Sequence, residues 1–243
     1  GISMMGEIFK IYKKNFKNFV IFFILSVILA LILTKLGGAF TESSNLEPSG
    51  FINIFNGKPI TKIFAFVLID IYINTYGLVI ARKAIKEDLI DEGKVFSDAL
   101  HFYPRILGIS IAYIIIIWLI GLLFYSMMIS AKSSYGLVIL LAFLLLIALA
   151  VIGIFANPIT NYLIYHDEAI KLSIKEGIKI GKKYFFKILG LLVIAALLST
   201  LTTTNVSKNN ILALIIANFI VSMYTMYLNL YIINLCKIEG QIN

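Results

Sequence analysis

Residues 172–203 read LSIKEGIKIGKKYFFKILGLLVIAALLSTLTT, and this segment combines two patterns. From Leu172 to Lys183, apolar residues alternate with lysines at helical spacing. An aromatic hinge, Tyr184–Lys187, then leads into the uninterrupted apolar run 188–198. This order is typical of a basic amphipathic helix in the lipid headgroup layer that continues as a membrane span.

The same order of features occurs twice more, nearer the N-terminus. The earlier copies are Lys14–Phe19 before the run 20–33, and His101–Arg105 before the run 106–129. Phe16, Tyr103 and Phe185 align at spacings of 87 and 82 residues. A repeat of this length usually marks a copied supersecondary unit. The sequence therefore predicts three copies of one unit, which consists of an interfacial helix, a span out and a span back.

The composition excludes a soluble protein. Of 243 residues, 60% are hydrophobic and 14% are charged, whereas soluble chains average about 25% charged residues. Outer-membrane barrels need alternating apolar residues, and the apolar runs here are continuous. The predicted fold class is all-α, a polytopic membrane helical bundle that forms one domain over residues 4–243. Residues 1–3, which precede Met4, are expected to be a cloning remnant, and no cleavable signal peptide is expected.

Six apolar runs approach the ~20 residues that a helix needs to cross the hydrocarbon core. The predicted spans are 19–36, 61–81, 106–129, 137–165, 186–203 and 211–236. Basic amphipathic helices are predicted on the cytoplasmic side at 6–17, at 82–105 (one helix or a bent pair) and at 172–183. Pro158 lies within the fourth span and is expected to kink it, because proline removes a backbone hydrogen bond.

Lysine and arginine are unequally distributed between the two sides of the predicted bundle. Sixteen lie in the N-terminal segment, the second and fourth loops and the C-terminal segment, and five lie on the opposite side. This asymmetry predicts a multi-pass protein of the cell (plasma) membrane with both termini in the cytoplasm. The anionic inner leaflet then accounts for the net charge of +8, and no nucleic acid partner is expected. The cations expected at the membrane surface are Lys13, Lys14, Lys17, Arg105, Lys182, Lys183 and Lys187.

Polar side chains gather in the second, fourth and sixth spans. They form pairs at i and i+4, so both members of a pair lie on one helix face. The pairs are Asp70 with Asn74, Asn157 with Asn161, and Thr225 with Asn229. Asn218 extends the last stripe, and Tyr76 and Tyr227 lie nearby in the sequence. Together these nine residues predict a ligand-binding cavity in the inner-leaflet half of the bundle.

Two interpretations of these polar residues compete. Asparagine and threonine also form hydrogen bonds between helices in membrane bundles, at about 0.6–2 kcal/mol each. Asp70 points more strongly to function, because a carboxylate in hydrocarbon costs at least ~2.5 kcal/mol unless it is paired or neutralised. Gly177 and Gly181 have the small-residue spacing that permits close helix contact, which offers weak support for a dimer.

No catalytic or metal-binding motif is visible in the sequence. A phosphate-binding glycine loop, a paired-histidine metal motif and a nucleophile elbow are all missing. The single cysteine, Cys236, is expected to be a buried small hydrophobic residue. A non-enzymatic protein without a cofactor or metal is therefore expected.

Three stretches, Lys13–Lys17, Phe96–Leu107 and Lys182–Leu189, share the basic-aromatic entry into an apolar hairpin. In this pattern the chain resembles the membrane domain found ahead of some bacterial glycerophosphoryl diester phosphodiesterases. It is also similar to related uncharacterised prokaryotic six-helix proteins. The resemblance covers nearly the whole chain and implies a six-helix membrane domain. The phosphodiesterase catalytic domain is absent, so the resemblance carries over neither that activity nor any site residue.

The sequence thus predicts an integral membrane protein that binds or moves a lipid or small amphiphile in an inner-leaflet cavity. The basic residues around such a cavity would suit an anionic headgroup. One alternative is a structural or scaffolding membrane protein, and another is an ion- or proton-coupled transporter that uses Asp70. The expected partners are membrane lipids, and a homo-oligomer or an unknown membrane partner stays open.

Overall fold

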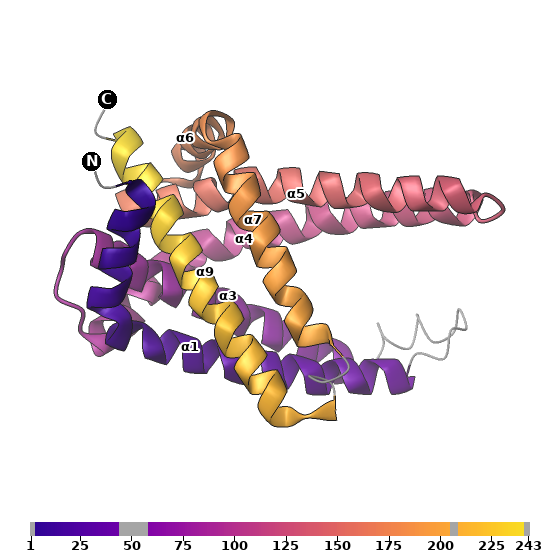
Figure 1. The fold of residues 1–243 in the computed structure, drawn as a ribbon, viewed down its shortest axis with the longest axis horizontal. Coiled ribbons are helices and arrows are strands. Elements are labelled where there is room, and N and C mark those ends of the chain that lie inside the picture. The colour runs from indigo at the N-terminus through magenta and orange to yellow at the C-terminus, as the bar shows by residue number, and fades with distance from the viewer. Residues whose placement is uncertain (1–2, 44–57, 205–208, 241–243) are drawn as a thin grey trace. The chain divides into compact units, whose positions relative to one another are not determined.

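The computed structural model describes residues 3–43, 58–204 and 209–240, which form helices and no strands (Figure 1). The helices are α1 (Met4–Ser43), α3 (Lys58–Ile85), α4 (Glu92–Ser130), α5 (Tyr135–His166), α6 (Ile170–Lys183), α7 (Phe185–Ser199), the short 3₁₀ helix η1 (Thr200–Thr203) and α9 (Ile211–Gly240). The predicted all-α class is confirmed for these residues.

Six of these segments are long and apolar enough to cross a membrane. They are Met4–Leu36, Ile60–Ile85, Glu92–Ser130, Tyr135–His166, Phe185–Thr203 and Ile211–Gly240. Each contains one of the six predicted spans and extends it at one or both ends. This agreement follows from the length of the apolar runs, which is a local property of the sequence. The chain therefore has the helices of a multi-pass membrane protein, whereas the threefold repeat stays a prediction.

Of the three predicted amphipathic helices, the first two are not separate helices, and their interfacial role stays a prediction. Helix α1 is continuous from Met4 to Ser43, so 6–17 is simply its first part. The segment 82–105 is divided between the last turn of α3, a turn at Glu87 with φ of 57°, and the start of α4. Helix α4 continues through Pro104, which was expected to mark the entry to a span. Asn18, which lies between the basic segment and the first predicted span, does not interrupt α1. Pro104 likewise does not end α4.

The third amphipathic segment does form a helix of its own. Helix α5 ends at Asp167, which adopts the left-handed conformation with φ of 50° and ψ of 49°. Aspartate tolerates this conformation better than most residues, because its short polar side chain can form local hydrogen bonds. Helix α6 then ends at Tyr184, whose backbone angles are not helical. The aromatic hinge of the sequence is therefore a true break between α6 and α7.

The chain divides into two compact units. The first comprises Gly1–Tyr103 and Ala195–Leu230, and the second comprises Pro104–Ile194 and Tyr231–Asn243. In the first unit, the aromatic residues Phe19, Phe22 and Phe23 of α1 are buried. Gly77 of α3 admits the Phe22 ring, because a Cβ there would lie 2.5 Å from the ring atom Cε2. The absence of a side chain at this one position allows α1 and α3 to pack closely.

In the second unit, α6 packs against α5 through its two glycines. A Cβ on Gly177 would lie 2.5 Å from Ile159 Cα, and a Cβ on Gly181 would lie 2.6 Å from Phe155 Cδ1. A Cβ on Gly181 would also lie 3.2 Å from the carbonyl oxygen of Ile154. That carbonyl has no intrahelical donor at i+4, because Pro158 lacks an N–H. The spacing of Gly177 and Gly181 therefore serves the contact between α6 and α5 of the same chain. It no longer supports a dimer.

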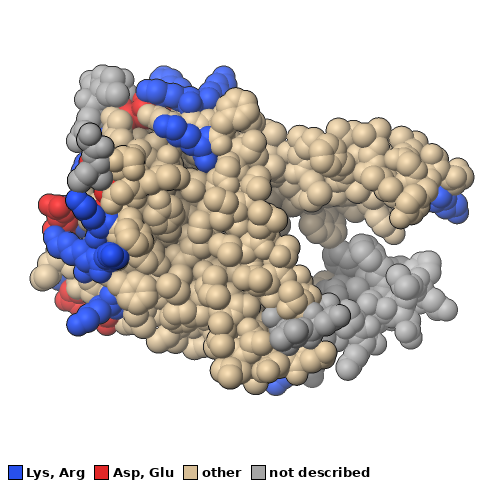
Figure 2. Space-filling view, in the orientation of Figure 1, with Lys and Arg blue, Asp and Glu red and all other residues tan. Residues whose placement is uncertain are grey.

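Helices α4 and α5 form a hairpin through the turn 131–134, and the parts of both helices near this turn expose large apolar side chains. Figure 2 shows uncharged side chains along this hairpin, with basic side chains at its turn. Trp118 is 52% exposed and Leu146 is 65% exposed, and many neighbouring aliphatic residues are similar. An apolar surface of this extent is not stable in water, and lipid is its natural solvent.

Candidate functional site

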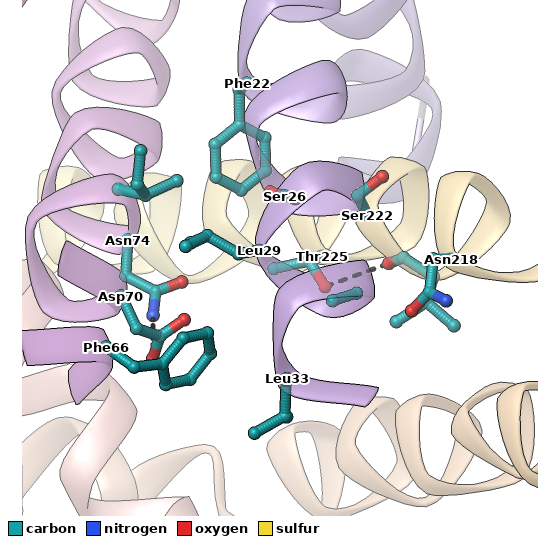
Figure 3. Close-up of a pocket in the computed structure, with 13 residues that line it drawn as sticks. Phe22, Ser26, Leu29, Leu33, Phe66, Asp70, Asn74, Asn218, Ser222 and Thr225 are labelled. Carbon is teal, nitrogen blue, oxygen red and sulfur yellow. Dashed lines mark hydrogen bonds between the residues drawn. The ribbon is translucent and has the colours of Figure 1, made fainter. Parts of the chain in front are cut away.

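The first unit contains a cavity of about 210 Å³ between α1, α3 and α9 (Figure 3). Its lining is polar on α3 and α9 and largely apolar on α1. The lining residues are Phe22, Ser26, Leu29, Ala30, Leu33, Phe66, Asp70, Ile73, Asn74, Asn218, Val221, Ser222 and Thr225. Four of the nine predicted binding residues are therefore in the lining, and five are not.

Helical periodicity explains which residues reach the cavity. On α3 the lining positions are Phe66, Asp70, Ile73 and Asn74, which follow the i, i+4, i+7, i+8 spacing of one helix face. The α9 and α1 lining residues follow the same rule. Among the predicted residues, Asp70, Asn74, Asn218 and Thr225 all line this cavity, with α1 rather than α5 supplying the third wall.

Four polar side chains of the cavity each donate one hydrogen bond within their own helix. Asn74 Nδ2 donates to Asp70 Oδ2 at 3.2 Å, one turn away on α3. On α9, Asn218 Nδ2 donates to the Leu214 carbonyl at 2.9 Å, and Thr225 Oγ1 donates to the Val221 carbonyl at 2.9 Å. Ser222 Oγ donates to the Phe219 carbonyl at 2.9 Å. The oxygens of these cavity-lining side chains therefore keep acceptor capacity.

Asp70 is the one ionisable side chain among the cavity-lining residues. It is half-buried near the middle of α3, and it accepts the bond from Asn74. A carboxylate at this depth is costly unless it meets a hydrogen-bond donor, a cation or water. The neighbouring amide supplies one donor, and a second partner has room in the cavity.

An apolar groove of about 400 Å³ adjoins the polar cavity. It runs between α1 and α3, and its walls are Leu25, Ile28, Leu29, Ile32, Leu36, Lys62, Ala65, Phe66, Ile69 and Ile73. Leu29, Phe66 and Ile73 line both spaces, so the two share a wall. A cavity with six polar side chains in its lining, called the polar cavity below, thus lies directly beside a groove that is almost wholly apolar.

Asn157 and Asn161 belong to the second unit and are not among the residues that line this cavity. Asn157 Nδ2 donates to the Gly153 carbonyl at 2.8 Å, and Asn161 Nδ2 donates to the Asn157 carbonyl at 2.6 Å. Asn161 is 2% exposed, and its Oδ1 has no hydrogen-bond partner among the described residues. A binding role for these two residues stays a prediction.

Three further predicted residues, Asn229, Tyr76 and Tyr227, also lie outside the lining. Tyr76 is fully buried with its ring 4.6 Å from that of Phe96, and its hydroxyl has no hydrogen-bond partner in the described structure. The Tyr227 ring packs 6.4 Å from that of Tyr12. Tyr76 and Tyr227 therefore pack against other aromatic rings.

Tyrosine hydroxyls form three hydrogen bonds that join helices of the first unit. Tyr12 donates to the Met223 carbonyl at 2.9 Å, which joins α1 to α9. Tyr72 and Tyr103 join α3 and α4 by donating to the carbonyls of Phe96 and Leu68, at 2.9 and 2.8 Å. The sequence did not indicate these bonds, because aromatic residues near span ends are also expected as headgroup anchors.

Ser26 and Ser222 line the cavity but were not among the predicted binding residues. The helical spacing already places Ser222 on the same stripe as Asn218 and Thr225, although Ser222 was not among the nine predicted binding residues. Ser26 is an isolated polar residue in an apolar span, and no sequence pattern distinguishes it from a residue that bonds to its own backbone.

The predicted surface cations divide into two groups. Lys13, Lys14, Lys17, Lys182, Lys183 and Lys187 are exposed, whereas Arg105 is half-buried. Arg105 forms an ion pair with Asp167 at 2.6 Å and donates to the Glu168 carbonyl at 2.8 Å. It therefore holds the turn between α5 and α6, in addition to any role at the membrane surface.

The end of α6 is tied to the C-terminal end of α9 by Glu239. Its carboxylate accepts hydrogen bonds from Lys183 Nζ and from the Tyr184 hydroxyl, both at 2.7 Å. The bond to Glu239 raises the pKa of Lys183, and burial followed by the same carboxylate raises the pKa of Tyr184. Raised pKa values mean that both contributions to stability are complete at neutral pH. On the alkaline side, they are lost as the pH rises through the folded-state values of Lys183 and Tyr184.

The described residues contain no group of three or more His, Cys, Asp or Glu side chains that could hold a metal ion. Cys236 is fully buried, with Sγ 3.9 Å from the Pro158 carbonyl oxygen. The chemistry available in the cavity is therefore hydrogen bonding and charge, supplied by Asp70 and the amide and hydroxyl oxygens.

No protein-family model matches the chain, and no curated protein or solved structure matches it. The resemblance to the membrane domain of glycerophosphoryl diester phosphodiesterase-like proteins stays a prediction. The cavity and the groove beside it are therefore the basis for assigning a function.

Proposed function

We propose that this chain is a non-enzymatic integral membrane protein that binds a lipid or small amphiphile between α1, α3 and α9. The headgroup lies in the polar cavity, and the apolar chain lies in the groove between α1 and α3. In this proposal both termini face the cytoplasm, and the basic segments lie at the inner leaflet.

One observation carries this proposal: the polar cavity and the apolar groove share the wall formed by Leu29, Phe66 and Ile73. An amphiphile has the same division, with a polar end joined to an apolar end. The cavity of about 210 Å³ is smaller than the roughly 300–1,000 Å³ of pockets for drug-sized ligands, so it suits a headgroup rather than a whole lipid. The groove of about 400 Å³ supplies the remaining space.

Native mass spectrometry of the protein released from nanodiscs tests this proposal with three alanine-to-leucine variants. Ala30→Leu places a larger side chain at the polar cavity, and Ala65→Leu does so at the apolar groove. Ala112→Leu is the matched control, because Ala112 is exposed on α4 and lines neither space. The wild type and the control are expected to retain a stoichiometric lipid, and the two filling variants are expected to retain at least about tenfold less.

Equal lipid retention by all four proteins would contradict the proposal. Lipid would then only coat the apolar surface, and the scaffolding alternative would lead. The melting temperature of each variant, measured on the same preparations, separates loss of binding from loss of the fold.

A second candidate function is ion- or proton-coupled transport through Asp70. The observation that favours it is that Asp70 is the one ionisable residue lining the cavity. Under this alternative, Asp70→Asn abolishes flux in proteoliposomes while the melting temperature is retained. Lipid retention in the variant would then be unchanged.

A further inference from the structure

We infer that the headgroup bound in this cavity is a hydrogen-bond-donating cation, namely the primary ammonium of an amphiphile. This inference rests on the proposed binding function and specifies the chemical class of its ligand. It differs from the anionic headgroup that the basic segments alone would suit.

Most hydrogen-bond donors of the cavity are already in use. A hydroxyl has a single donor hydrogen, and the hydroxyls of Ser222 and Thr225 already donate to carbonyls of α9. Asn74 and Asn218 each use one amide hydrogen in the same way. These amides must donate through nitrogen, since a carbonyl or carboxylate partner can only accept.

The oxygens of these groups retain their acceptor capacity. Asp70 offers its carboxylate, Asn74 and Asn218 offer Oδ1, and Ser222 and Thr225 offer hydroxyl lone pairs (Figure 3). Acceptors therefore outnumber the remaining donors in the cavity. A complementary ligand brings N–H or O–H groups rather than further oxygens.

The charge of the cavity favours a cation. The lining includes the Asp70 carboxylate and no lysine or arginine. In a low-dielectric environment this carboxylate repels a phosphate, sulfate or carboxylate group and attracts a cation. Lys62 lines the apolar groove rather than the polar cavity, so it does not neutralise Asp70 within the headgroup space.

Cations of equal charge differ in the number of donors that they bring. A primary ammonium carries three N–H donors and matches the ring of oxygens, whereas a quaternary ammonium carries none. Charge-assisted hydrogen bonds are roughly twice as strong as neutral ones. A primary ammonium is therefore favoured over a quaternary one.

The experiment compares four amphiphiles with one tail in phosphatidylcholine nanodiscs, whose quaternary headgroups provide a background without N–H donors. The probes are dodecylammonium, dodecyltrimethylammonium, dodecanol and dodecyl sulfate. Occupancy is measured by native mass spectrometry on the wild type, on Ala30→Leu to define cavity-specific binding, and on Asp70→Asn. Asp88→Asn is the matched control, because it removes the same charge from the exposed turn after α3.

For the wild type, dodecylammonium is expected to bind at least about tenfold more tightly than dodecyltrimethylammonium, with dodecyl sulfate weakest. Asp70→Asn should abolish this preference and leave dodecanol unchanged, while Asp88→Asn should behave as the wild type. The series on the wild type is informative even if a variant fails to fold.

Different failures have different meanings. Equal cavity-specific binding of all four probes, or a preference for the sulfate, would overturn the ammonium inference and leave the proposed amphiphile binding intact. Binding of every probe that is the same in the wild type and in Ala30→Leu would overturn both.

Discussion

At the scale of single residues, several short polar side chains of the spans donate a hydrogen bond within their own helix. Asparagine, serine and threonine in the spans donate to the carbonyl three or four residues earlier, as Asn157, Asn218 and Thr225 do. A carbonyl at this distance is always present in a helix, so a short polar side chain needs no partner from elsewhere. The longer tyrosine side chain cannot reach its own helix backbone in this way, and it bonds to a neighbouring helix instead.

The buried carbonyl oxygen of Asn161 leads to a prediction of increased stability. Asn161→Leu keeps the branched shape of the side chain and removes an Oδ1 atom that has no hydrogen-bond partner among the described residues. An unsatisfied buried polar group costs about 1–3 kcal/mol, so the variant should unfold at a higher temperature. Differential scanning fluorimetry in detergent tests this. Asn161→Asp, which retains the shape but introduces an acid, should be less stable. A lower melting temperature for Asn161→Leu would contradict this prediction and show that the bond from Nδ2 to the Asn157 carbonyl outweighs the cost of the unpaired oxygen.

At the scale of elements, only the third basic segment forms a separate helix. Helices α1 and α4 run through the positions where the sequence pattern changes from basic-amphipathic to apolar. A change in hydrophobic pattern does not by itself end a helix, because the backbone hydrogen bonds are the same on both sides of it. Helix α6 ends because the chain adopts non-helical angles at Tyr184, and its glycines are then packed against α5.

Two glycine-to-alanine substitutions should differ in their effect on stability, because Gly177 lies at the contact between α5 and α6 and Gly190 lies in α7, away from any contact. In Gly177→Ala the new Cβ would meet the Ile159 backbone at 2.5 Å, so the helices must separate, at a cost of roughly 1–3 kcal/mol. In Gly190→Ala the new Cβ would meet nothing within 4 Å, so the higher helix propensity of alanine should leave the protein unchanged or slightly more stable. Thermal unfolding of the two purified variants measures the difference. Equal melting temperatures would disprove the close packing of α6 on α5.

At the scale of the whole molecule, the six apolar helices and the exposed aliphatic surface of α4 and α5 require a membrane environment. The orientation in that membrane depends on charge rather than packing. Sixteen lysines and arginines lie on one predicted side and five on the other, and this difference is what the insertion machinery reads.

Alkaline phosphatase and green fluorescent protein fusions test the orientation in a bacterial host. Phosphatase fused after Lys132, in the turn between α4 and α5, should be active, because it folds only outside the cytoplasm. Phosphatase fused after Asp91 or at the C-terminus should be inactive, and green fluorescent protein at the same two sites should fluoresce. An active phosphatase at the C-terminus would reverse the predicted topology.

The sequence by itself determined the helical class, the six spans and the i, i+4 polar pairs, because apolar run length and helical periodicity are properties of a few neighbouring residues. It also identified Asp70, Asn74, Asn218 and Thr225, four of the residues that line the cavity. Only the tertiary structure decided that these residues share a cavity with Ser26 and the apolar residues of α1. The physical reason is that a cavity is defined by which helix faces pack together. That choice depends on distant contacts, such as Phe22 against Gly77, which no local pattern encodes.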